Sequence, residues 1–180
     1  MKTNNFLKTL WVTGALVWAG LAAAQTSAVL IYDDTKPAIK FAAGDLKAAL
    51  ELKRQFTVTT APPAQIALQT APVQVIVTTN GAIAGQPAVA GLSKEGFAIR
   101  RVTTATNATQ WWVIGNDPAG AMYAALEVAE TVKIDGGLGN VNNKQLANPS
   151  LAVRGFKFNL PLDDRNETYT DKTPSAQYNY

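Results

Sequence analysis

Apolar and polar positions beyond residue 25 follow two different periods, which predicts strands and helices in alternation. Short apolar runs at 28–32 and 55–60 are rich in β-branched or aromatic residues, as strands are. Between them, at 37–53, apolar residues recur at spacings of three and four, which indicates an amphipathic helix with its charged residues facing water. A strand, a helix and a second strand favour parallel pairing with a right-handed crossover. The apolar positions of this helix are Ile39, Ala42, Ala43, Leu46, Ala49 and Leu50.

The middle of the chain predicts three more strands. The run 73–79 is dense in β-branched residues, which predicts a strand buried on both faces. Residues 80–92 contain Gly and Pro without a period, so we expect a loop there. The segments 95–104 and 110–115 are expected to pair as a hairpin.

Two tryptophans are adjacent in the last of these strands. Trp111 and Trp112 cannot face the same side of a strand, because successive side chains point to opposite faces. We expect one of them in the core and the other over an edge or an interface. A paired tryptophan platform for sugar is the alternative.

A second amphipathic helix is predicted at 118–132. Asp117 is placed to cap it and Pro118 occupies its first position, where a missing N–H costs nothing. An earlier turn at 33–35 is a candidate cap for the first helix. The apolar stripe of the second helix is expected to be Met122, Ala125, Leu126 and Ala129.

These elements predict an α/β fold with two layers. Both helices have a single apolar stripe, so we expect them on one face of a mixed sheet of four or five strands. Residues 25–135 form this domain, 136–150 are expected to be a linker, and 151–180 are expected to begin another domain or to form a disordered tail.

The first 24 residues have the pattern of a secretory signal peptide. Lys2 and Lys8 precede an apolar run at 10–21, and small residues up to Ala24 provide a cleavage site. The run is shorter than the ~20 apolar residues that an uncleaved membrane anchor needs. The sequence therefore predicts a secreted or periplasmic protein that is cleaved near Ala24 and has no membrane contact afterwards.

Composition excludes several kinds of chemistry. The 180 residues include no Cys and no His, which removes thiolate catalysis, disulfides and the commonest zinc ligands, and the sequence predicts no cofactor and no metal. The HExxH motif of zinc proteases needs His, so that class is excluded as well. Lys2 and Lys8 are two of the 16 basic residues, which leaves 14 against 13 acidic residues after cleavage. Such a balance gives no electrostatic basis for binding nucleic acid.

Two motifs resemble those of a known group of enzymes. Gly115, Asp117, Gly120, Tyr123 and Ala124 fit a turn-and-helix pattern G-x-D-x-x-G-x-x-Y-(A/G). Pro149, Arg154 and Gly155 fit a pattern P-x-x-x-x-R-G that leads into a strand. With the order of elements, these motifs resemble the N-terminal accessory domain, sometimes described as zincin-like, of bacterial glycoside hydrolases. The relatives are the family 20 β-hexosaminidases and the α-glucuronidases, and the resemblance spans roughly 28–171.

The resemblance implies that 152–160 is the first strand of a (β/α)8 barrel and that the chain is a piece of a larger hydrolase. On this view the catalytic carboxylates belong to later strands, so no catalytic residue is assigned within this chain. The resemblance places Arg154 in the substrate pocket, and Asp163 and Arg165, in the loop that follows, are further candidates for sugar contacts. Asp163 and Asp164 are adjacent and point apart, so they do not form a catalytic pair. In the alternative, 152–160 is a last strand of the small domain's own sheet.

The sequence thus predicts the non-catalytic N-terminal domain of a secreted glycoside hydrolase, whose carbohydrate substrate binds through a catalytic domain outside this chain. The alternative function is a stand-alone secreted module that binds carbohydrate or mediates adhesion through exposed aromatic residues such as Trp111 or Trp112.

Overall fold

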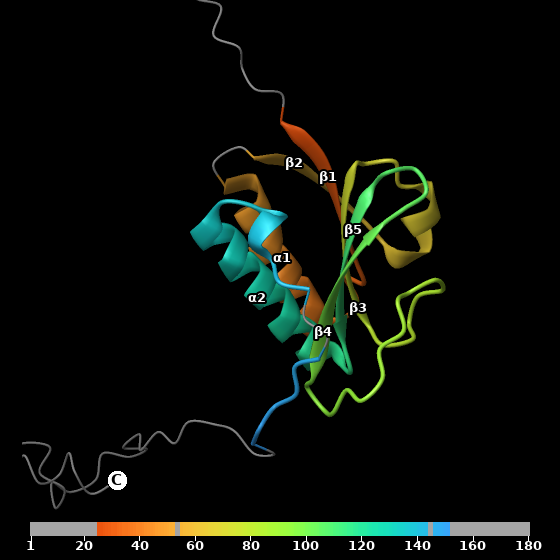
Figure 1. Cartoon of the computed structure of the whole chain (residues 1–180), viewed down its shortest axis with the longest axis vertical. Helices are drawn as coiled ribbons and strands as arrows, with labels where there is room; N and C mark the ends of the chain where they lie inside the picture. The colour runs from red at the N-terminus through yellow and green to blue at the C-terminus, as the bar shows by residue number, and fades with distance from the viewer. Residues whose placement is uncertain (1–24, 53–54, 144–145, 152–180) are drawn as a thin grey trace, which may run out of the picture.

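The computed structural model describes residues 25–52, 55–143 and 146–151. These residues form a five-stranded sheet in the order β2-β1-β3-β5-β4, with two long helices (Figure 1). The elements are β1 (Thr26–Tyr32), α1 (Pro37–Glu51), β2 (Phe56–Ala61), the 3-10 helix η2 (Pro63–Leu68), β3 (Val73–Thr79), β4 (Phe97–Thr103), β5 (Thr109–Gly115), α2 (Pro118–Asp135) and the 3-10 helix η3 (Leu138–Asn140). The predicted two-layer α/β fold is confirmed.

The sheet is mixed, as the sequence predicts. Strand β1 pairs in parallel with β2 and β3, and β3 pairs in parallel with β5. Strand β4 pairs antiparallel with β5 in the predicted hairpin. Its turn contains Asn107, which has a φ of 61°, a conformation that Asn tolerates better than most residues. The 80–92 segment forms turns and irregular structure, in agreement with the predicted loop.

Helices α1 and α2 lie side by side on one face of the sheet (Figure 1), so their predicted placement is confirmed. Of the predicted stripe of α2, Ala125 and Ala129 are buried as expected, whereas Met122 and Leu126 are only partly buried. Small residues face α1 and the sheet instead, because they let α2 approach both closely. Buried residues of α2 are Gly120, Ala121, Ala124, Ala125, Val128, Ala129 and Val132.

The opposite face of the sheet is also covered. Apolar residues of η2 and of the 80–92 loop pack there, among them Ile66, Ile83 and Leu92. Because both faces are covered, β3 is buried along its middle, as its β-branched sequence predicts. Together the helical layer and this second layer form a core on each side of the sheet.

Trp111 and Trp112 point to opposite faces, and each is only 3% exposed. Trp111 lies in the core beneath the helices, with the guanidinium of Arg101 5.4 Å from its ring centre. Trp112 packs on the other side, where its indole N–H donates to Gln110 (3.0 Å) and Gln110 in turn donates to Gln74 (2.9 Å). One tryptophan lies in the core as expected, but the other is buried as well and does not cover an edge or an interface, and two buried rings on opposite faces form no platform for sugar.

The two helices start differently. Asp117 caps α2 as predicted, and its side chain accepts a hydrogen bond from the backbone N–H of Gly120. The cap position of α1 is Lys36, which makes no side-chain capping bond. Asp33 lies too far before Pro37 to reach the helix, and its carboxylate accepts from the N–H and hydroxyl of Thr35 instead (3.0 and 2.6 Å). The predicted cap for α1 is thus a local turn.

Residues after α2 pack along the edge of the sheet. The helix ends at Gly136, whose φ of 80° suits glycine, and Leu138 and Val141 are buried in the helical core. Further along, Ala147 forms an isolated antiparallel bridge with Phe97 of β4. The segment expected to be a linker therefore includes residues that contact the domain. The strand predicted at 152–160 and the signal peptide predicted at 1–24 lie outside the described residues.

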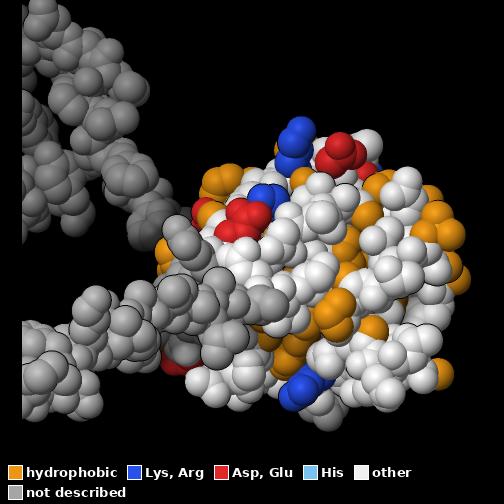
Figure 2. Space-filling view, turned by 90° about the horizontal axis from the view of Figure 1, so that it is seen from above, with side chains coloured by type: hydrophobic (Ala, Val, Ile, Leu, Met, Phe, Trp, Pro, Cys, Tyr) orange, Lys and Arg blue, Asp and Glu red, His pale blue; other side chains and the backbone are white. Residues whose placement is uncertain are grey.

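Within the described residues, no helix has the length and apolar character needed to span a membrane. On the face shown in Figure 2, Lys and Arg side chains are few and lie apart, with apolar side chains visible between polar ones. The coloured part of this face therefore shows no basic patch.

Candidate functional site

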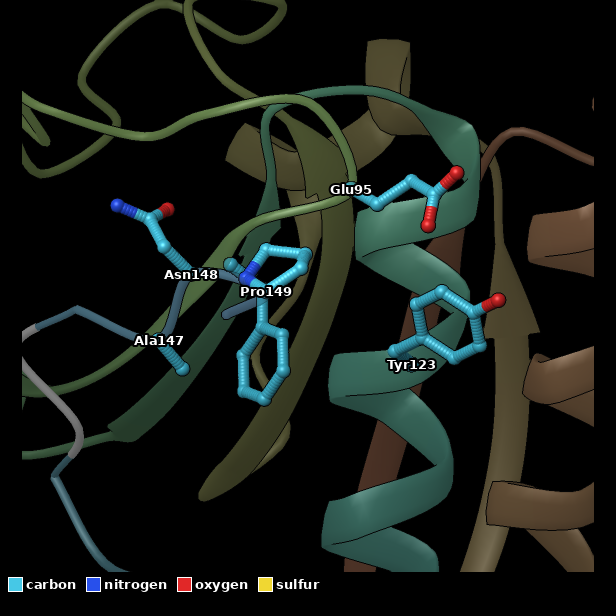
Figure 3. A pocket seen from close by; sticks show the side chains of 6 residues that line it. Glu95, Tyr123, Ala147, Asn148 and Pro149 are labelled. Carbon is cyan, nitrogen blue, oxygen red and sulfur yellow. The ribbon is translucent and has the colours of Figure 1, made fainter. Parts of the chain in front are cut away.

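One described residue from each of the two motifs that carry the resemblance lies at the same corner of the molecule. A hollow of about 220 Å³ lies there, lined by Glu95, Phe97, Tyr123, Ala147, Asn148 and Pro149 (Figure 3). Tyr123 belongs to the first motif and Pro149 to the second, although the two are far apart in the sequence. Figure 3 shows Tyr123 and Glu95 on one side of the hollow and Ala147, Asn148 and Pro149 on the other.

Asp117 of the first motif joins α2 to the loop before β4. Its Oδ1 accepts from the N–H of Gly120 (2.9 Å), and its Oδ2 accepts from the N–H of Glu95 (2.7 Å). Burial opposes the charge of this carboxylate, yet the N–H groups of Glu95, Gly120 and Ala119 hold its pKa below the ordinary value. Asp117 is therefore an ionised structural group whose oxygens already accept backbone hydrogen bonds.

The motif glycines allow close approach of backbone to backbone. A Cβ on Gly115 would lie 1.9 Å from the nitrogen of Ala121, and a Cβ on Gly120 would lie 2.4 Å from the carbonyl oxygen of Gly96. Residue 116 also donates its N–H to that carbonyl of Gly96 (2.8 Å). The first turn of α2 and the loop before β4 are consequently packed without space for side chains.

The opposite wall of the hollow is fixed by hydrogen bonds. Phe97 and Ala147 exchange both backbone N–H···O bonds at 2.8 Å. The side chain of Asn148 accepts from the N–H of Ser93 (2.9 Å) and donates to the carbonyl of Gly91 (2.9 Å). Four hydrogen bonds thus hold the chain just before Pro149.

Tyr123 supplies the exposed aromatic surface of the hollow. It lies one helical turn after Gly120, and its side chain is 41% exposed. With Phe97, Ala147 and Pro149 it makes the lining largely apolar, while Glu95 adds a carboxylate at the rim. The arrangement suits packing against an apolar side chain that is flanked by basic groups.

The sequence did not predict this site. Tyr123 and Pro149 were noted only as positions of the two motifs, and Glu95, Phe97 and Asn148 were not singled out at all. The adjacent pair Glu95 and Gly96, in which Glu95 has a φ of 61°, is a turn signal that could have marked the loop. Nothing in the sequence indicates that Asn148 pairs with a loop 55 residues earlier.

The predicted sugar contacts Arg154, Asp163 and Arg165 lie outside the described residues. Among the residues that line the hollow, Glu95 is the one carboxylate, whereas glycoside hydrolysis uses a facing pair. The described part of the chain contains no cluster of acidic side chains able to hold a metal ion. The described lining of the hollow therefore shows no facing pair of carboxylates.

Comparisons with known proteins give little. No family model matches the chain, and no curated protein matches it. Among solved structures there is a likeness to a GH138 enzyme targeting pectin rhamnogalacturonan II, with a TM-score of 0.42 and 18% identity. It covers 63% of this chain, which spans only 14% of the length of that enzyme. A likeness this weak supports no assignment of function.

Proposed function

We propose that residues 25–151 are a non-catalytic accessory domain of a secreted glycoside hydrolase, placed directly before its catalytic barrel. The observation that carries the proposal is that one residue of each motif lines the same hollow, Tyr123 on one side and Pro149 on the other. Both motifs are defined by the sequence alone, without regard to their positions in space. That Tyr123 and Pro149 share a hollow supports a common structural task for the two segments.

That task is to define where the chain leaves the domain. Asp117 and the motif glycines fix the start of α2 against the loop before β4. The same loop holds Asn148, and β4 holds Ala147. A substitution at the start of α2 would therefore alter the position of Pro149, where the next domain is proposed to begin.

Catalysis is assigned to the following barrel, and Arg154, Asp163 and Arg165 remain its proposed sugar contacts within this chain. The substrate is an oligosaccharide or polysaccharide, and export through the proposed signal peptide would bring the protein to it. The alternative of a carbohydrate-binding module on Trp111 or Trp112 loses its binding surface, since both side chains are buried.

The test compares this chain with the longer protein encoded when its reading frame is extended. Both are purified and assayed against aryl glycosides, with substrates that include uronic acid and N-acetylhexosamine glycosides. We expect turnover by the longer protein and none above background by the 180-residue chain. An extended frame that encodes no domain with carboxylates at strand ends would contradict the proposal. Turnover by the short chain that is lost in Asp163→Asn or Asp164→Asn would also contradict it.

A further inference from the structure

The hollow beside Tyr123 lies where the described chain ends, and this position indicates what covers it. Ala147 and Asn148 are fixed to β4 and to the preceding loop, Pro149 lines the hollow, and the last described residue is Leu151. Whatever follows Leu151 starts within a few residues of the hollow. A segment tethered so closely has an effective concentration in the mM range at this surface.

We propose that the hollow is the docking site for residues 152–160 of this chain, and that the ring of Phe156 or Phe158 fills it. This inference deepens the proposed function by assigning the contact through which the domain holds the start of its neighbour. It rests on the proposed function for the identity of that neighbour, but not for the contact itself.

Size and polarity support an aromatic occupant. A cavity of ~150 Å³ holds a benzene molecule, so a hollow of about 220 Å³ accommodates a phenylalanine ring. Tyr123, which lines the hollow, is 41% exposed, and Leu146 and Leu151, which flank the lining segment 147–149 in the sequence, are 46% and 64% exposed. Burying such a side chain contributes about 1.5–3 kcal/mol, which gives the contact a driving force.

Reach and charge support the same segment. Phe156 is seven residues after Pro149, so an extended chain spans up to about 25 Å between them, enough to turn back to the hollow. The rim carries Glu95, and the segment carries Lys157. Opposite charges at the edge of an apolar contact favour this pairing over an acidic partner.

Cysteine pairs test the contact in the chain itself, which has no native Cys to interfere. One variant combines Lys94→Cys, next to Glu95 at the hollow, with Lys157→Cys. The matched control combines Thr103→Cys with Lys157→Cys. Thr103 is exposed at the far end of β4, about 20 Å from Phe97 along the strand. Residue 157 is eight residues after Pro149 and reaches about 28 Å, so a freely moving segment would reach both positions.

Disulfide formation in a glutathione redox buffer gives the effective concentration for each pair. We expect a value on the order of 10-fold higher for the 94–157 pair than for the 103–157 pair. Adding Tyr123→Asp, or Phe156→Ser together with Phe158→Ser, should remove that preference, while hydrogen exchange in β3 confirms that the fold is intact. Equal values for the two pairs, or a preference that survives Tyr123→Asp, would overturn the inference. If the proposed function is wrong, the longer protein will show no hydrolysis, whatever the disulfide experiment gives.

Discussion

The carboxylate of Asp117 bonds to the backbone N–H of Glu95 at 2.7 Å, across 22 positions of the sequence. The other oxygen of the same side chain caps α2 through Gly120. One residue thereby holds together the start of a helix and the loop that enters β4. Since that loop also binds Asn148, the bond ties the core of the domain to the point of exit of the chain.

Replacing Asp117 should therefore cost more than the loss of an ordinary helix cap. We expect Asp117→Ala to lower the free energy of unfolding by about 2–3 kcal/mol, because it removes the cap and leaves the N–H of Glu95 without its acceptor. Urea denaturation of the chain measures this. Asp33→Ala is the control, since its bonds lie within an exposed turn, and it should leave the stability nearly unchanged. Equal effects of the two substitutions would show that the bond to Glu95 is unimportant.

The depressed pKa of Asp117 also predicts a pH dependence. The folded pKa lies below the unfolded value of about 3.9, so the ionised carboxylate contributes stability that is fully present above that value. This contribution is lost as the pH falls through the folded pKa. Urea midpoints measured from about pH 6 to about pH 2 should fall more steeply for the natural chain than for Asp117→Asn, which cannot titrate at this position. Parallel curves would contradict the assignment.

Substitutions at two glycines distinguish a position where backbones are in close contact from one where only helix propensity matters. Gly120→Ala should destabilise the domain by about 1–3 kcal/mol, because the new Cβ would lie 2.4 Å from the carbonyl oxygen of Gly96. Gly44→Ala in α1 is the matched control, since no atom lies within 4 Å of its Cβ position. There we expect a gain of about 0.5–1 kcal/mol from helix propensity. A neutral or stabilising Gly120→Ala would mean that the loop before β4 is free to move away.

The buried tryptophans should behave as core residues. Trp111→Ala and Trp112→Ala are each expected to cost about 3–5 kcal/mol in thermal or urea unfolding. Phe41→Ala removes an aromatic ring that is 64% exposed and should change stability by less than about 0.5 kcal/mol. If either tryptophan variant kept its full stability and instead lost binding to a polysaccharide, that tryptophan would have to contact sugar, and its assignment to the core would be wrong.

Local patterns of the sequence predicted most of the fold. The helix at 37–53, the doubly buried strand at 73–79 and the Asp117 cap follow from periodicity and capping chemistry, which depend on neighbours in the chain. Errors arose where tertiary packing decides. Helix α2 buries its alanines rather than Met122 and Leu126 because α1 lies close by. Trp112 is buried because the 80–92 loop covers the second face of the sheet.

The candidate site was predictable only in part, for a related reason. Tyr123 and Pro149 stood out only as positions of the two motifs. The contacts of Phe97 and Asn148 depend on pairing of β4 and of the loop before it with a segment some 50 positions later. Such long-range contacts leave no periodic signal in a single sequence. These contacts fix Ala147 and Asn148, the two residues before Pro149.

Hydrogen exchange across 154–160 tests most directly whether this segment begins another domain. In the 180-residue chain, docking through a Phe side chain leaves the segment's backbone amides without strand partners. The account therefore predicts that they exchange on the order of 100-fold or more faster than those of β3, the central buried strand. Protection at 154–160 equal to that of Val73–Thr79 would place the segment in the domain's own sheet and contradict the accessory-domain account.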